Sequence, residues 1–143
     1  MNVRTILAAK GGEIVSIEPT ADLSAAAKLM SARRIGAVVI RGVGGRLSGI
    51  LSERDIVRAV AEHGATALAL PVAQAMTRNV MTCGEDDTVA ELMEQMTAGK
   101  FRHIPVVNDG HLVGLVSIGD VVKQRVEEFE RESEAMRDYI RSA

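Results

Sequence analysis

The chain has 143 residues, of which 47% are hydrophobic and only 2% aromatic, so its core must be built from aliphatic side chains and methionine. Its 17 Lys and Arg residues against 19 Asp and Glu give a net charge of −2, which does not favour binding to nucleic acid or to an anionic membrane. The single cysteine excludes an internal disulfide, and neither a membrane-spanning run nor a signal-peptide segment is recognisable. We therefore expect a soluble, cytoplasmic protein of one domain or two small halves.

The first half of the chain reads as a strand, a helix, two strands and a helix. A short apolar strand is predicted at 14–17, and the following helix carries apolar residues at helical spacing from Leu23 to Met30. Two strands, 37–40 and 47–52, are joined by a glycine-rich turn, and a second helix starts at Ser52, where the second strand ends.

The second half repeats this order at an offset of about 66 residues. A strand at 80–83, a helix at 89–96, strands at 103–107 and 112–117 and a final helix from Ser117 are predicted. The fold class is therefore α/β, with two β-α-β-β-α repeats at 8–65 and 72–127 and a tail at 128–143. Each repeat alone is small for an independent core, so we expect the two to pack together.

Polar residues recur at the start of each final helix. GILSERD and GLVSIGD place Gly49, Ser52 and Asp55 in the first copy and Gly114, Ser117 and Asp120 in the second. One interpretation is structural, because Ser-x-x-Asp at a strand-to-helix junction resembles a capping box. The other is a ribose-phosphate cradle. Free N–H groups and a hydroxyl suit a phosphate, a carboxylate can accept both ribose hydroxyls, and glycine lets a base approach.

These two segments resemble the G-h-x-[ST]-x-x-D signature of CBS domains, regulatory modules named after cystathionine β-synthase. The resemblance covers about 12–126 and includes FRHIPVVNDGHLVG in the second copy. It implies a pseudo-twofold pair of repeats with adenosyl ligands in the clefts between them and no catalytic residue. AMP is the first choice of ligand, with ATP, NADH and S-adenosylmethionine as alternatives, and an unidentified protein would be regulated.

The resemblance also assigns residues to the ligand sites. Asp55 and Asp120 match ribose-binding aspartates, and Ser52 and Ser117 match hydroxyls near the phosphate. The segments 10–15 and 76–81 resemble linkers that line the opposite repeat's pocket. The full set of assigned residues is Lys10, Val15, Ile35, Gly36, Gly49, Ile50, Ser52, Arg54, Asp55, Met76, Met81, Arg102, His103, Ile104, Pro105, Gly114, Leu115, Ser117, Gly119 and Asp120.

The two copies differ near the expected phosphate position. The second copy has Arg102 and His103 where the first has Gly36 and Ala37, while the first has Arg54 beside its aspartate. Because arginine is a strong phosphate donor, we expect the Asp120 pocket to bind a mononucleotide most tightly. The first pocket would take a larger or weaker adenosyl ligand such as NADH.

The tail carries apolar residues from Val122 to Ile140 at alternating spacings of four and three, which is typical of a coiled-coil seam. It is either an amphipathic helix lying on its own domain or a contact for a partner. The resemblance implies a homodimer formed through helices, and candidate faces lie at Ala26, Met30, Leu92 and Met96, alongside the tail itself.

Other chemistries find little support in the sequence. The three histidines and Cys83 lack metal-ligand spacing, no Ser-His-Asp set has a nucleophile-elbow context, and the glycines at 42–45 precede no helix. The main rival to a nucleotide sensor is a ligand-independent dimeric scaffold whose Ser and Asp residues only cap helices. A nucleic-acid-associated module is disfavoured by the near-neutral charge.

Overall fold

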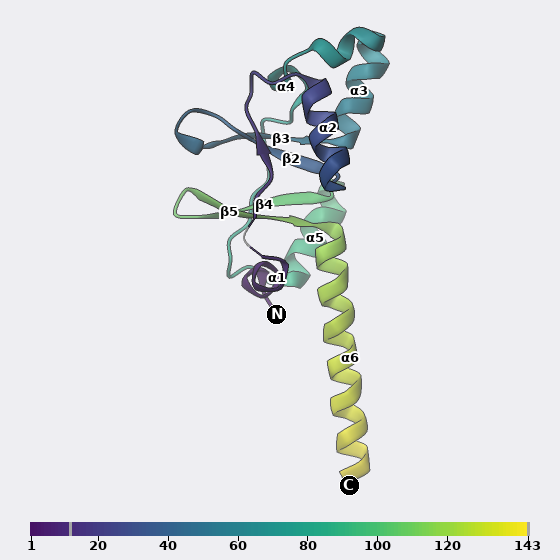
Figure 1. Cartoon of the computed structure of the whole chain (residues 1–143). Coiled ribbons are helices and arrows are strands. Elements are labelled where there is room, and N and C mark those ends of the chain that lie inside the picture. Colours follow the sequence, from purple (N-terminus) through teal and green to yellow (C-terminus); the bar gives the residue numbers. More distant parts are fainter. Residues whose placement is uncertain (12, 143) are drawn as a thin grey trace. The chain divides into compact units, whose positions relative to one another are not determined.

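The computed structural model describes residues 1–11 and 13–142 and confirms a mixed α/β fold with two repeats and a C-terminal helix (Figure 1). The elements in chain order are α1 (Val3–Lys10), β1 (Ser16–Ile17), α2 (Leu23–Arg33), β2 (Ala37–Arg41), the 3-10 helix η1 (Val43–Gly45), β3 (Leu47–Ser52), α3 (Glu53–His63), the 3-10 helix η2 (Gly64–Ala69), α4 (Val72–Ala75), α5 (Val89–Gly99), β4 (His103–Asn108), β5 (His111–Ser117) and α6 (Ile118–Ser142). None of the helices in the described part of the chain combines the length and apolar character needed to cross a membrane.

The chain forms two compact units. The Asp55 unit comprises residues 13–81 and 110–112, and the Asp120 unit comprises residues 1–12, 82–109 and 113–143. The residues after α3 therefore stay with the first repeat, whereas the N-terminal residues belong to the unit of the second repeat. The sequence analysis did not predict α1, η2 or α4.

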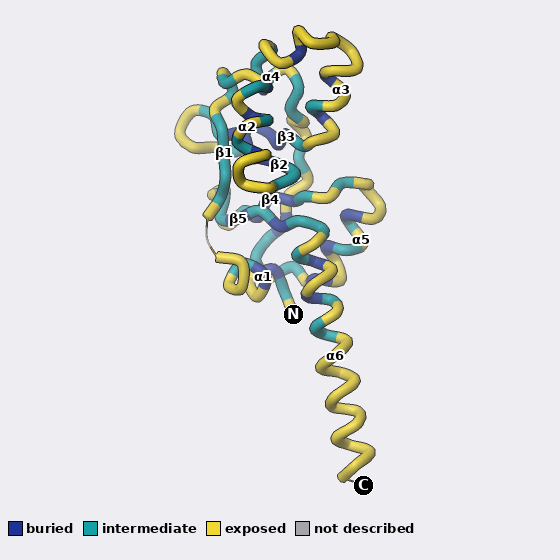
Figure 2. Tube along the Cα trace, turned by 45° about the vertical axis from the view of Figure 1, so that its right-hand side comes forward, coloured by how far each residue is buried: buried dark blue, intermediate teal, exposed yellow. Residues whose placement is uncertain are grey.

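The Asp55 unit contains a three-stranded sheet in the order β1-β2-β3. β1 and β2 are parallel, with Ser16 opposite Val39, and β2 and β3 are antiparallel, with Val39 opposite Ile50. The α2 helix begins at its N-cap Asp22, whose carboxylate accepts the Ala25 N–H at 2.8 Å. Its apolar stripe is buried against the strands and against residues of η2 and α4 (Figure 2).

The Asp120 unit pairs β4 with β5 and replaces the predicted strand at 80–83 by a single parallel bridge between Cys83 and Val106. Cys83 N–H donates to the Pro105 carbonyl at 3.0 Å, and Val107 N–H donates to the Cys83 carbonyl at 2.9 Å. Proline has no N–H, so the bond that Val39 donates to the Val15 carbonyl in the first repeat has no counterpart at Pro105. The strand is shorter for that reason.

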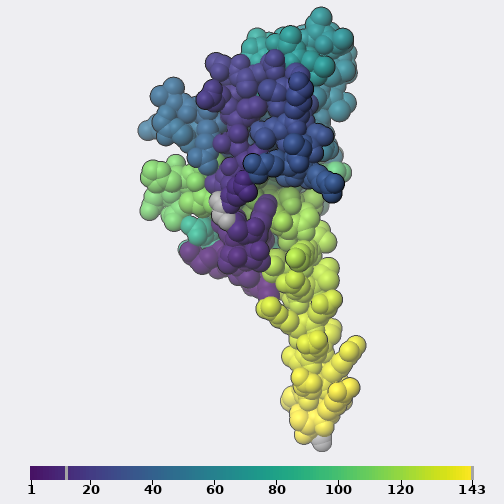
Figure 3. Space-filling model, in the orientation of Figure 1, coloured from purple at the N-terminus to yellow at the C-terminus, as the bar shows by residue number. Residues whose placement is uncertain are grey.

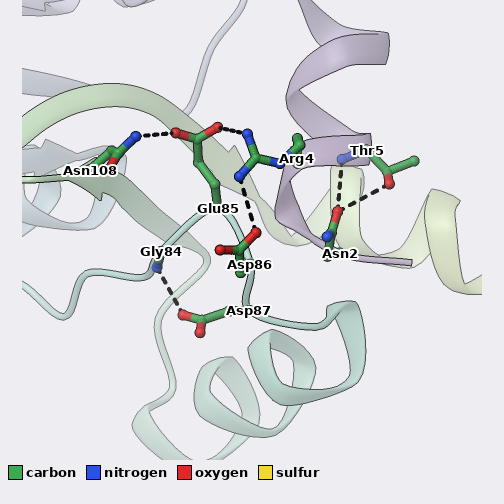
Figure 4. Close-up of polar contacts among 8 residues, drawn as sticks. All are labelled: Asn2, Arg4, Thr5, Gly84, Glu85, Asp86, Asp87 and Asn108. Carbon is green, nitrogen blue, oxygen red and sulfur yellow. Dashed lines mark hydrogen bonds and ion pairs between the residues drawn. The ribbon is translucent and has the colours of Figure 1, made fainter.

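The first helix is anchored on the loop before α5 (Figure 4). Asn2 caps α1, and Arg4 donates to Glu85 at 2.9 Å and to Asp86 at 3.0 Å. Asn108 donates to the second oxygen of Glu85 at 2.9 Å. Below these polar contacts the α1 residues Val3 and Ile6 are buried in the same core as the second repeat, so α1 is an integral part of the Asp120 unit.

The helix faces expected to form a dimer are not available. Ala26 and Met30 are buried in the core of the Asp55 unit, and Leu92 and Met96 are buried in the core of the Asp120 unit. That expectation was wrong because the apolar stripe of each helix covers the unit's own strands.

The tail is helical, as the spacing predicted, but beyond Glu128, which binds the Met1 amino group at 3.3 Å, it does not lie on its own unit. It continues the helix that starts at Ile118, and every described residue from 129 to 142 is exposed (Figures 2 and 3).

Candidate functional site

Both repeated Ser-x-x-Asp segments form capping boxes, the first of them at the start of α3. Asp55 N–H donates to Ser52 Oγ at 3.3 Å, and Ser52 N–H donates to Asp55 Oδ2 at 2.9 Å. At the start of α6 the matching distances are 3.2 Å from Asp120 N–H to Ser117 Oγ and 2.9 Å from Ser117 N–H to Asp120 Oδ2. The structural interpretation of these residues is therefore realised in both repeats.

The Asp55 carboxylate is enclosed and has partners on both oxygens. Its side chain is only 5% exposed. Oδ1 accepts hydrogen bonds from Arg58 at 3.1 Å and Thr77 at 3.5 Å, while Oδ2 accepts the two bonds from Ser52. A ligand that used this carboxylate would have to exchange with one of these donors.

The Asp120 carboxylate is more accessible, with a side chain 26% exposed, and it forms an ion pair with a lysine. Lys10 Nζ, from the end of α1, lies 2.7 Å from Asp120 Oδ2 and 2.6 Å from the Leu115 carbonyl oxygen. Burial acts to raise the pKa of Asp120, but the hydrogen bonds from Lys10 and Ser117 outweigh burial and hold the pKa below its ordinary value. The ammonium therefore occupies both of these acceptors.

The repeated glycines are required by the chain's own packing. A Cβ on Gly49 would lie 2.6 Å from the Thr77 carbonyl oxygen and 2.9 Å from the Met76 sulfur. A Cβ on Gly114 would lie 2.5 Å from a methyl group of Leu7. In the Asp55 unit residues of the 76–81 segment thus lie over Gly49, whereas in the Asp120 unit the residue over Gly114 is Leu7 of α1, outside the 10–15 segment that the resemblance named.

The residues that the sequence placed near an expected phosphate contribute backbone groups in a matched way. The Gly36 carbonyl accepts the Glu53 N–H at 3.0 Å, and the Arg102 carbonyl accepts the Ile118 N–H at 2.7 Å. Each bond ties the segment before a strand to the first residue of the helix. The Arg102 side chain is exposed beside the start of α6, which leaves its guanidinium accessible to an anion.

The remaining predicted residues lie in the cores, on the strands, in the first helical turns and in the linker. Several support the scaffold: Ile104 is buried in one core, Ile35 and Val15 pack against the other, and Pro105 provides the carbonyl that Cys83 uses. Ile50 and Leu115 lie on β3 and β5 next to the glycines, and Arg54 and Gly119 lie in the first helical turns. Met81 is about half exposed in the linker, and His103 begins β4.

Two residues at these sites were missed by sequence reasoning. Thr77 pairs with Ile50 through two backbone hydrogen bonds of 3.1 and 2.9 Å and also reaches Asp55. Arg58 binds the same carboxylate from one turn further along α3. Arg58 could have been found from its i, i+3 spacing to Asp55, whereas Thr77 lies in the 76–81 segment that the resemblance named as a pocket-lining linker without singling out this residue.

The described residues hold no group of three or more His, Cys, Asp or Glu side chains that could bind a metal ion. The two sites present polar groups of matching kinds. Each offers a carboxylate acceptor, a serine hydroxyl and strand carbonyls at a helix N-terminus, which are groups that bind hydroxyls and phosphates.

The CBS domain family matches residues 8–62 and 72–127, and the chain belongs to this family of paired repeats. A CBS-domain containing protein from Agrobacterium tumefaciens has a crystal structure with a TM-score of 0.85 and 46% sequence identity, covering 87% of this chain and 92% of that one. Among curated relatives, a mitochondrial CBS domain-containing protein from Arabidopsis thaliana is 35% identical over 80% of this chain. The chain spans 58% of that relative and 24% of a larger Arabidopsis relative.

Two similar structures contain adenosyl ligands. A CBS domain protein from Pyrobaculum aerophilum, complexed with AMP, is 31% identical with a TM-score of 0.75, over 84% of this chain and 89% of that one. The CBS domain pair of protein MJ0100, in complex with 5-methylthioadenosine and S-adenosyl-L-methionine, is 26% identical with a TM-score of 0.79, over 90% and 98%.

Proposed function

We propose that this chain is a non-catalytic regulatory module that binds an adenosyl ligand and passes its level to a partner protein. AMP is the ligand we favour, with ATP, NADH and S-adenosylmethionine as alternatives. The observation that carries the proposal is the duplicated carboxylate at a helix N-terminus, in a fold whose liganded relatives hold AMP or S-adenosylmethionine. A regulated partner would sense the liganded state through a change in the module's surface.

The Asp120 site is the primary site in this proposal. Its carboxylate is the more exposed of the two, and the exposed Arg102 guanidinium lies in the segment tied to the same helix start. The Asp55 site, with Arg54 in the first turn of α3, would take a weaker or larger ligand such as NADH.

Isothermal titration calorimetry with AMP, ATP, NADH and S-adenosylmethionine tests the proposal directly. Asp120→Ala should abolish the tight site and cost at most about 1 kcal/mol of stability as a lost helix-start carboxylate. Asp138→Ala, an exposed change of the same charge near the end of α6, is the matched control and should bind like the wild type. No heat with any of the four ligands would contradict the proposal.

The second candidate is a ligand-independent scaffold, and the complete capping boxes favour it. If Asp120→Ala and Asp55→Ala unfold the protein while the wild type binds no nucleotide, capping is the whole role of these residues.

The proposed difference in affinity between the Asp120 and Asp55 sites has its own test. Arg102→Ala should weaken mononucleotide binding at the Asp120 site by roughly 1.5–3 kcal/mol, the range for a hydrogen bond to a charged group, and should spare the Asp55 site. Titrations that show two equal sites, or equal losses at both, would refute it.

We also propose that the module is a cytoplasmic homodimer. Support for the compartment comes from Cys83, a single buried thiol that forms no disulfide. Support for the dimer comes from the exposed apolar residues of α6. Light scattering that returned the 15.3 kDa chain mass would contradict the dimer.

A further inference from the structure

We infer that the exposed part of α6 pairs with the same segment of a second copy of this chain as a parallel two-stranded coiled coil. This assigns an interface to the proposed homodimer and does not depend on nucleotide binding. The contact surface is the α6 seam, defined as Val122, Val126, Phe129, Ser133, Met136 and Ile140.

The α6 seam is the most continuous apolar surface on this helix, and it is open to solvent. Its five apolar members are between 46% and 68% exposed. The opposite side of the helix is buried near its start, where Val121 and Gln124 pack against the Asp120 unit. The seam therefore faces away from the core that anchors the helix, and burying it requires another molecule.

The exposed part of α6 also lacks support from its own chain. Every described residue from 129 to 142 is exposed, although the helix is continuous. Isolated helices of about 12–15 residues are marginal in water, so a packed seam would explain why this segment stays helical. The four-three spacing matches the 3.5-residue repeat of a two-stranded coiled coil.

The charges that flank the seam select a second copy in parallel orientation. With Val126 at an a position, the g positions hold Arg125 and Glu132, and the e positions include Glu130 and Arg137. In a parallel pair each g residue faces the e residue of the next heptad on the other helix. Arg125 then faces Glu130, and Glu132 faces Arg137. Twofold symmetry repeats each contact, so all of these contacts join opposite charges.

Antiparallel pairing with the whole seam in contact would oppose like charges. There e residues face e residues and g residues face g residues. Glu130 would face Glu130 of the second copy, Glu132 would face Glu132, and Lys123 would face Arg137. The Arg125 guanidinium already lies 4.9 Å from the centre of the Phe129 ring, on the flank where the parallel contact needs it. It also binds Glu128 at 2.8 Å, so Glu132 and Arg137 are the cleaner pair to test.

The first experiment measures mass and stability of the full chain by analytical ultracentrifugation and thermal denaturation. Met136→Glu combined with Ile140→Glu should convert a dimer to a folded monomer, because both side chains are exposed and make no part of either core. Asp138→Asn, on the far side of the helix, should remain a dimer. A wild-type monomer overturns the inference and the proposed homodimer. A dimer that survives the double change overturns the seam as the interface and leaves the homodimer intact.

The second experiment fixes the orientation. Arg137→Glu should weaken a parallel dimer by about fivefold, and Glu132→Arg should do the same, whereas combining both should restore wild-type affinity. In the antiparallel arrangement Arg137→Glu would strengthen the dimer, because it places a carboxylate opposite Lys123. Stronger association of Arg137→Glu therefore overturns the parallel assignment.

Crosslinking gives an independent readout. Ile140→Cys should form a disulfide-linked dimer under mild oxidation, since identical seam positions are adjacent in a parallel pair. In the antiparallel pair the two positions would be about 27 Å apart at 1.5 Å per residue, too far for a disulfide. Asp138→Cys controls for random collision. Equal crosslinking of both variants, or none at Ile140→Cys, would overturn the inference.

Discussion

Lys10→Met tests whether the lysine at the end of α1 competes with a ligand for Asp120. The residue 66 positions later is Met76, so this substitution makes the two linkers alike. Lys10 Nζ lies 2.7 Å from Asp120 Oδ2 and 2.6 Å from the Leu115 carbonyl oxygen. A ribose hydroxyl that donates to Oδ2 must displace the ammonium or share its oxygen. We therefore expect AMP to bind Lys10→Met more tightly than the wild type.

The size of the gain follows from the exposure of the ion pair. The Lys10 and Asp120 side chains are 36% and 26% exposed, so solvent screens their attraction, and pairs of this kind contribute about 0.2–1 kcal/mol. Losing that interaction should lower the free energy of unfolding by at most about 1 kcal/mol and lower the AMP Kd by at most about fivefold. The two effects have the same origin, because the energy that holds Lys10 in the free protein is the energy a ligand must replace.

Calorimetry with AMP and urea denaturation measure these two quantities on the same samples. Lys28→Met, an exposed lysine on α2, removes the same charge elsewhere and should change neither. Weaker AMP binding by Lys10→Met would show that the ammonium contributes to the ligand site instead of competing for it. Reduced stability with an unchanged Kd would show that the ligand does not use Asp120 Oδ2.

Three other outcomes are expected. Because the pKa of Asp120 lies below its unfolded value of 3.8, its contribution to stability is present above that pH and lost as pH falls through the folded pKa, so acid denaturation should begin at a higher pH in Asp120→Asn. Burial, with a smaller effect of the nearby Asp87 carboxylate, raises the pKa of Cys83 to about 12, so labelling of the native thiol by a disulfide reagent at pH 8 should be about a thousandfold slower than in urea; rapid native labelling would contradict this. Gly49→Ala meets a backbone carbonyl and should cost about 1–3 kcal/mol in urea denaturation, whereas Gly114→Ala meets a rotatable leucine methyl and should cost less; equal losses would show that the linkers do not pack as described.

The repeated part of the fold could be predicted because its signals are local. Apolar spacing located α2 and α5, which the structure shows to begin after the N-caps Asp22 and Thr88. No local signal predicted that the strand at 80–83 would be reduced to a single bridge, because that depends on Pro105 lying opposite it in the ladder.

The candidate sites were predictable in composition but not in arrangement. The recurrence of Ser-x-x-Asp predicted both the carboxylates and their capping role. The contacts of Lys10 with Asp120 and of Thr77 with Asp55 join residues 110 and 22 positions apart, and local patterns carry no information on such pairs. The dimer faces failed for a related reason, since an amphipathic stripe shows that a face is covered without showing what covers it.

The placement of α1 in the Asp120 unit also sets an order of events during synthesis. The main part of the Asp55 unit, residues 13–81, is one continuous stretch and can fold as soon as it leaves the ribosome. The helix that carries Val3 and Ile6 is made earlier, yet the residues it packs against lie beyond residue 82. Its apolar side chains therefore have no packing partners while about half the chain is translated. A nascent chain stalled before β4 should therefore have a folded first unit and an N-terminal segment whose apolar side chains are still exposed. Exposed apolar side chains of this kind are what chaperones bind.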